Sequence, residues 1–122
     1  METTGKIQAI VPVLPSADIK RDLKWYMEKA GFQSIFGDNM YAVLRRKQHE
    51  IHLQWHADTE DDPLLGGSVI RIFVEDIHPV FEEFLKRGTV PKDKLRLNTP
   101  WGTHEFGFYD LNQNAIFWVQ DV

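Results

Sequence analysis

Apolar and polar residues alternate along two stretches of the chain, residues 40–55 and 105–120, and these stretches align without a gap. Each contains an alternating apolar segment, a polar turn and a second apolar segment, with Ile51 and Ile116 at the same position of the two copies. Alternation of this kind is typical of strands that bury one face, and the polar turn between them indicates a hairpin. The sequence therefore predicts two copies of one β-hairpin.

An amphipathic segment precedes each hairpin, with apolar side chains spaced three and four residues apart. Each segment starts at an Asp-Ile pair and ends at a glycine, namely Gly31 in the first copy and Gly88 in the second. Asp18 can accept hydrogen bonds from the first amides of a helix, which have no partner within the helix itself. The sequence predicts two helices, over residues 18–29 and 77–86.

The remaining apolar segments lack helical spacing and predict strands. Residues 6–14 are apolar around Pro12, which has no amide proton to donate to a sheet, so we expect this strand at a sheet edge. Residues 32–36 and 68–74 predict two further strands. Residues 89–100 show no period and are expected to be irregular.

The repeat and one break in composition define the organisation of the chain. Residues 57–67 are acidic, then contain a proline and two glycines, and they lie where the two copies meet. Because each half is too small to be stable alone, this segment is expected to connect two parts of one domain. We therefore expect a single α+β domain over residues 1–122, with module one at about 6–56 and module two at about 68–120.

Composition excludes several classes of function. A net charge of −4 argues against a nucleic-acid partner, which would need a basic surface to displace counterions. No apolar run approaches ~20 residues, so no membrane partner is expected, and the first residues lack the apolar core of a signal peptide. The chain has no cysteine, which excludes disulfides and thiol catalysis and makes the cytoplasm the expected compartment.

Four segments carry a resemblance to a known family. They are IVPVLPSAD at residues 10–18, the pairs Trp25-Tyr26 and Gly31-Phe32, and TPWGTHEF at residues 99–106 with Asp110 and Asn114 after it. They resemble the vicinal-oxygen-chelate superfamily and, within it, the glyoxalase/bleomycin-resistance branch. Leu111 and Gln113 stand where that branch favours proline and glycine, a departure that concerns turn geometry. The resemblance covers nearly the whole chain and implies two tandem βαβββ modules in a curved mixed sheet, the glyoxalase/bleomycin-resistance/dioxygenase-like fold.

The resemblance also locates the four metal-ligand positions of the enzyme members. They fall on Val11, His52, Val69 and Phe117 of this chain. Three of these side chains have no oxygen or nitrogen atom, and a catalytic site needs about three protein ligands and an open position. We therefore expect no catalytic metal, no other cofactor and no catalytic residue, which favours a protein that is not an enzyme.

Aromatic residues are the expected binding surface instead. In bleomycin-binding proteins of this branch a flat part of the drug lies between aromatic side chains at a dimer cleft, and these match Phe36, Tyr41 and Trp101 here. The repeat places Phe117 opposite His52 on the face of the cavity, and Glu105 or Asp38 is expected to attract a cationic part of the ligand. The predicted ligand-binding residues are Trp101, Phe36, Tyr41, His52, Phe117 and Glu105.

The leading hypothesis is a bleomycin-resistance-type protein that sequesters a planar or cationic compound in an aromatic cleft without turnover. The resemblance implies a homodimer, with the N-terminal strand as a candidate for exchange between chains. One alternative is a metal-dependent glyoxalase- or dioxygenase-like lyase or isomerase with diverged ligands. Another is a structural or regulatory module that binds no ligand, and the sequence leaves the identity of any ligand open.

Overall fold

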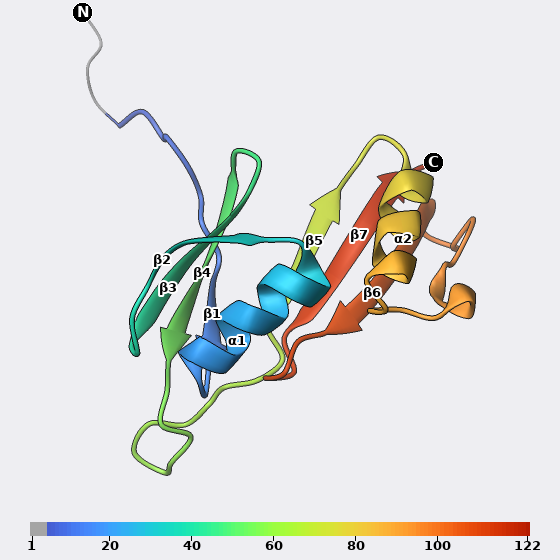
Figure 1. Cartoon of the computed structure of the whole chain (residues 1–122). Helices are drawn as coiled ribbons and strands as arrows, with labels where there is room; N and C mark the ends of the chain where they lie inside the picture. The colour runs from blue at the N-terminus through green and yellow to red at the C-terminus, as the bar shows by residue number, and fades with distance from the viewer. Residues whose placement is uncertain (1–4) are drawn as a thin grey trace, which may run out of the picture.

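Two mixed β-sheets form the frame of the protein in a computed structural model that describes residues 5–122 (Figure 1). The first sheet has the strand order β1-β4-β3-β2. Its strands are β1 Val13–Ser16, β2 Gln33–Gly37, β3 Tyr41–Arg46 and β4 His49–Trp55. Strand β1 pairs with β4 in parallel and the other neighbours are antiparallel, so β1 and β2 are the two edges of this sheet.

The second sheet repeats this arrangement with the order β5-β7-β6. Its strands are β5 Val69–Phe73, β6 Thr103–Tyr109 and β7 Ala115–Asp121. Strand β5 pairs with β7 in parallel, as β1 does with β4. Arg96 forms an isolated bridge with Glu105 of β6, at the position that β2 has in the first sheet. The predicted tandem α+β modules are confirmed, and the fourth strand of module two is reduced to this bridge.

The helices occur where the amphipathic segments predict them. They are α1 Ile19–Trp25 with a π-helical turn Tyr26–Ala30 after it, α2 Ile77–Lys86, and a 3-10 turn Lys92–Lys94 in the segment expected to be irregular. The side chains of Asp18 and Asp76 accept hydrogen bonds from first-turn amides of α1 and α2. Gly31 ends the first helical segment in the left-handed conformation, with φ of 75°. None of the helices in residues 5–122 is long and apolar enough to cross a membrane.

The two hairpins differ by one residue, which corrects the gap-free alignment. Ala42 of β3 pairs with Leu53, whereas the buried residue Phe106 of β6 pairs with Trp118. Strands β4 and β7 keep the register of the alignment, but β6 is displaced by one residue relative to β3. The second turn is longer because it is closed from the Asp110 amide to the Asn114 carbonyl and holds polar side chains that contact module one.

One apolar core serves both modules. Phe84 of α2 is fully buried, and its ring lies 5.2 Å from that of Phe108 and 5.5 Å from that of Trp118, measured between centroids. Trp25 at the end of α1 is 6.1 Å from Phe108, so the first helix also reaches the second sheet. Figure 1 shows α1 between the two sheets and α2 against the second. Among residues 5–122, no helix covers the opposite face of either sheet.

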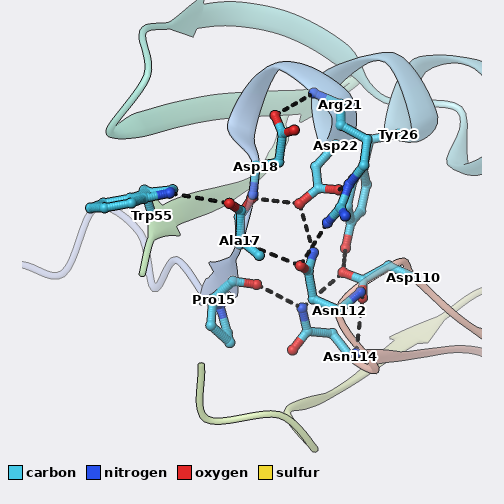
Figure 2. Close-up of polar contacts among 11 residues, drawn as sticks. Pro15, Ala17, Asp18, Arg21, Asp22, Tyr26, Trp55, Asp110, Asn112 and Asn114 are labelled. Carbon is cyan, nitrogen blue, oxygen red and sulfur yellow. Dashed lines mark hydrogen bonds and ion pairs between the residues drawn. The ribbon is translucent and has the colours of Figure 1, made fainter. Parts of the chain in front are cut away.

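A buried polar network joins the modules at the start of α1 (Figure 2). The Tyr26 hydroxyl and the Asn114 side-chain amide donate to Asp110 at 2.5 and 2.8 Å, and the Asn112 amide donates to Asp22 at 2.6 Å. All five side chains are buried. Burial raises the pKa of Tyr26 well above its usual range, and the charge of Asp110 raises it further. Two carboxylates are therefore kept in the interior by dense hydrogen bonding.

The chain before β1 does not form the strand expected over residues 6–14. The strand begins at Val13, and the preceding arm runs away from the rest of the molecule (Figure 1). Ile7 and Ile10 are 78% and 85% exposed. Pro12 cannot donate to a ladder, although its carbonyl accepts a hydrogen bond from the His52 amide at 2.9 Å. The edge position predicted for this strand is confirmed for β1, but its expected length is wrong.

Asn112→Ala is expected to lower the free energy of unfolding by about 2–4 kcal/mol, because it leaves buried polar groups without partners. The lost bonds are those to Asp22, to the Ala17 amide and to Arg21. Urea denaturation followed by tryptophan fluorescence measures the change. Leu111→Ala, in the exposed part of the same turn, is the matched control and should change the free energy by less than about 1 kcal/mol. Equal effects of the two substitutions would show that the network does not stabilise the fold.

Candidate ligand-binding site

Trp101 lies in a tight loop directly before β6 and its ring is 54% exposed. The Gly102 amide donates to the Thr99 carbonyl at 3.0 Å, and the Thr99 amide donates to the Thr103 carbonyl at 2.8 Å. Gly102 has φ of 82°, in the left-handed region that favours glycine. The indole Nε1 donates to Glu105 Oε1 at 2.8 Å. The loop therefore holds the indole by its nitrogen and leaves much of its surface open to solvent.

Glu105, beneath Trp101, is a buried carboxylate with only 3% of its surface exposed. Arg71 of β5 donates to its two oxygens at 3.1 and 3.3 Å, and the Thr103 hydroxyl donates at 2.6 Å. Burial would raise the pKa of Glu105, but the hydrogen bonds from Arg71, Thr103 and Trp101 outweigh it and lower the pKa to about 2. The negative charge of Glu105 is thus paired with Arg71 inside the protein, and the same carboxylate orients Trp101 by a hydrogen bond.

Phe117 forms an aromatic surface in the middle of the second sheet. Arg71, Phe117 and Gly107 are paired across β5, β7 and β6, so they lie in one row. The Phe117 ring lies so close over Gly107 that a Cβ at that position would collide with it. A cavity of about 290 Å³ borders Phe117, and Arg96 and Glu105 also line it. The open face of the second sheet thus has two aromatic platforms, Trp101 and Phe117.

The corresponding face of the first sheet has a chain of hydrogen bonds. Tyr41 Oη lies 2.8 Å from His52 Nδ1, and His52 Nε2 lies 3.1 Å from Glu50 Oε1. Because a carboxylate only accepts, His52 Nε2 carries a proton, and when the ring is neutral its Nδ1 accepts from Tyr41. Arg45 donates to the other Glu50 oxygen at 2.7 Å, and hydrogen bonds from Arg45 and then His52 lower the pKa of Glu50. This face can exchange hydrogen bonds with a ligand.

Phe36 lies on the edge strand β2 and is half exposed. It pairs with Val43 of β3, and Val43 pairs with His52 of β4, so Phe36 is in the same row as His52. The pairing shifts at a bulge between Ser34 and Phe36, which sets the face to which Phe36 points. Phe36, Tyr41 and His52 therefore share the open face of the first sheet.

The six predicted site residues form two groups of three. Phe36, Tyr41 and His52 lie on the first sheet, and Trp101, Glu105 and Phe117 belong to the second module. Within residues 5–122, no hydrogen bond, ion pair or ring contact joins one group to the other. Asp38 does not lie free at either surface, because its side chain accepts from the amides of Met40 and Tyr41. The two groups are two separate walls in a single chain.

Sequence reasoning missed the arginines that accompany these residues. Arg71 is the one charged residue in the apolar stretch 69–73. A charged side chain in a strand of this buried type indicates that an oppositely charged side chain lies nearby. Arg96 is in the irregular segment before Trp101, where no period marks it. Arg45 and Glu50 are paired across the hairpin at sites that alternation assigns to the polar face. Their contacts depend on strand register, which the sequence leaves open.

Metal ligands do not gather on the described residues. Among residues 5–122, no group of three or more histidine, aspartate or glutamate side chains could hold an ion. His52 has Glu50 and Tyr41 as its neighbours in place of further ligands. That the protein uses no catalytic metal stays a prediction, to be tested in solution.

A larger cavity, of about 810 Å³, lies elsewhere, between the N-terminal arm, the start of β4 and β5. Its apolar lining includes Ile10, Ile70 and Ile72. None of the six predicted ligand-binding residues lines it. This cavity lies between the arm and the free edge of the second sheet, and it adjoins the Phe117 platform at Arg71, which lines the cavity and lies over the Phe117 ring.

Several known proteins similar to this chain are described as bleomycin resistance or bleomycin-binding proteins. No protein-family profile matches it. Bleomycin resistance proteins of Geobacillus stearothermophilus and Staphylococcus aureus are 25% identical over 92% of this chain and 96% of their own length. The bleomycin-binding protein of Streptomyces verticillus complexed with copper(II)-bleomycin has a TM-score of 0.71 and 24% identity over 94% of this chain and 97% of its own. A glyoxalase/bleomycin resistance protein/dioxygenase from Nocardioides has a TM-score of 0.76 and 14% identity over 98% and 87%.

The pKa of Glu105 gives a prediction for stability against pH. Folding lowers this pKa from 4.5 to about 2, so the stabilisation is fully present above about pH 4.5 and is lost as the pH falls towards 2. Glu105→Gln should lower the melting temperature at pH 7 and flatten its decline between about pH 4.5 and 2. Thermal melts followed by circular dichroism measure both curves. Glu82→Gln, on an exposed position of α2, is the control and should follow the wild type. Parallel curves for wild type and Glu105→Gln would contradict the assignment.

Proposed function

We propose, from the premise that the chain belongs to the glyoxalase/bleomycin-resistance branch of the vicinal-oxygen-chelate superfamily, that it binds a planar bleomycin-type compound and sequesters it without turnover. The observation that carries this proposal is the exposed Trp101 ring, which Glu105 holds by its indole nitrogen. Binding by aromatic stacking needs flat rings that are exposed and fixed before the ligand arrives. The negative net charge of the chain supports long-range attraction of a ligand that is cationic overall.

The two walls, one on each sheet, support different parts of the proposed binding. Trp101 and Phe117 offer surfaces for stacking, whereas the Tyr41 hydroxyl, whose proton is bonded to His52, offers an oxygen that can still accept a hydrogen bond. Phe36 adds an exposed ring to the second of these walls. A ligand with a flat part and a polar part would use both. We infer sequestration because the protons of Tyr41 and His52 are already donated within the protein, to His52 and to Glu50 respectively.

We propose that a homodimer brings the two walls together, with the first sheet of one protomer facing the second sheet of its partner. Three features support this arrangement. The walls lie on separate surfaces of one chain, β1 and β5 are both free sheet edges, and the arm exposes Ile7 and Ile10 to water. Exposed isoleucines and unpaired edges favour association. Exchange of the arm would place it against the partner's β5.

Since the chain has no cysteine, we also infer that it works in the cytoplasm.

Trp101→Ala is expected to weaken binding of metal-free bleomycin by about 1–3 kcal/mol, as removal of a stacking residue at the centre of a site does. The melting temperature should change little, because a half-exposed ring contributes less to the core than a buried one. Isothermal titration calorimetry and thermal melts give the two values, and Trp101→Phe, which keeps a ring, should retain part of the affinity. Unchanged affinity with a large fall in melting temperature would make Trp101 a structural residue.

Dialysis of the protein against EDTA should leave the affinity intact, whereas a loss would favour the metalloenzyme alternative.

The dimer is tested by the mass of the protein in solution. Size-exclusion chromatography with light scattering at micromolar concentration should give twice the chain mass of 14.3 kDa. Ile10→Asp should shift the protein towards monomer, because it places a charge where the arm would bury an apolar side chain. Gln8→Asp adds the same charge at a polar position of the arm and should leave the mass unchanged. A monomeric wild type would overturn the dimer.

A further inference from the structure

Each aromatic platform of the second sheet already has a guanidinium against its ring. The Arg96 carbon Cζ is 5.0 Å from the centre of the Trp101 ring, and the Arg71 carbon Cζ is 5.6 Å from that of Phe117. Both distances are within the range of cation–π attraction. A ring that binds a cation on one face offers less negative potential to a second cation. These platforms are therefore electron-poor surfaces.

The charges around the platforms do not cancel. Glu105 is matched by Arg71 through two hydrogen bonds. Asp93 and Lys94, which also line the small cavity, are of opposite sign. Arg96 lines the same cavity, and within residues 5–122 no carboxylate lies within ion-pair distance of it. The lining of the cavity itself has two cations and two carboxylates. Counted with Arg71, which lies over Phe117 outside that lining, three cations and two carboxylates surround the two platforms, so a positive charge is left over beside the exposed Arg96.

We propose that the second sheet binds a planar group with an anionic substituent, of the aromatic carboxylate class, and that Arg96 selects for it. This inference rests on the proposed function, because it names the chemistry of the group that stacks at the same site. The flat ring lies on Trp101 or Phe117, where the guanidinium behind the platform favours an electron-rich partner. The carboxylate pairs with Arg96, which lines the 290 Å³ cavity. Any cationic part of the ligand lies outside this cavity, since Glu105 is already neutralised by Arg71.

The experiment compares two probes of the same ring size and opposite charge, 2-naphthoate and 2-naphthylmethylammonium, titrated into the full chain by calorimetry. We expect 2-naphthoate to bind about tenfold more tightly. Arg96→Gln should remove most of this preference, whereas Arg96→Lys should keep part of it because the positive charge remains. Lys92→Gln, an exposed residue of the same segment, is the matched control and should leave the preference unchanged. Trp101→Ala should weaken both probes.

Equal affinity for the two probes, tighter binding of the ammonium, or no binding of either would overturn the inference. A preference that survives in Arg96→Gln would remove Arg96 from the assignment and overturn it as well. Bleomycin titrated in parallel separates the two proposals. Bleomycin binding without a naphthoate preference leaves the proposed function in place and rejects the aromatic carboxylate. Naphthoate binding without bleomycin binding rejects the bleomycin-type ligand and supports the anionic class.

Discussion

The buried polar network between α1 and the β6–β7 turn is the constraint on which the arrangement of the two modules depends. Two carboxylates, Asp22 and Asp110, lie in the interior. Asp22 accepts hydrogen bonds from Asn112 of the other module and from Ser16 and Arg21 of its own, and Asp110 accepts from Tyr26 of the other module and from its own turn. Removing a carboxylate from water costs several kcal/mol unless such bonds replace the lost hydration. The bonds have fixed lengths and directions, whereas apolar contacts tolerate sliding. The network therefore sets the relative position of the sheets more sharply than the shared aromatic core can.

The length of the turn follows from this network. The second turn needs one residue more than the first to bring Asn112 to Asp22 and to let Asp110 accept from the amides of Asn112 and Asn114. The first hairpin has no comparable task and closes between Arg46 and His49. In a strand, a shift of one residue moves every side chain to the opposite face. The extra residue in the turn thus allows β6 to keep its aromatic side chains in the core while Glu105 and Gly107 lie on the same face of the sheet as Arg71 and Phe117.

The sequence predicted those parts of the fold that local patterns govern. Helix α2 has the bounds that the apolar spacing gives, and α1 begins at the capping residue Asp18, because caps and amphipathic stripes are local properties. The expected strand over residues 6–14 was wrong because strand formation needs a neighbour that no local pattern supplies. The gap-free alignment of the repeat was wrong by one residue for a similar reason. The length of the second turn depends on a contact between Asn112 and Asp22, which is distant in the sequence. Arg96 was missed as a site residue for the same reason. Its contact with Trp101 depends on the conformation of a loop, which no periodic pattern in the sequence indicates.

Duplication of the module explains why the two walls have a corresponding central row of paired residues but different chemistry. His52 and Phe117 occupy the same position of β4 and β7, and each is paired across its sheet with a residue of the parallel edge strand, Val13 in the first case and Arg71 in the second. In this row the first module has the His52 imidazole, which Tyr41 and Glu50 orient by hydrogen bonds. The second module has the Phe117 ring, with the Arg71 guanidinium lying over it. If two symmetric copies faced each other, a planar polar ligand would meet the same chemistry on both sides and bind in two equivalent orientations. In the dimer that we propose, divergence of this row would give the ligand a single preferred orientation, with its flat part against the second sheet and its hydrogen-bonding part against the first.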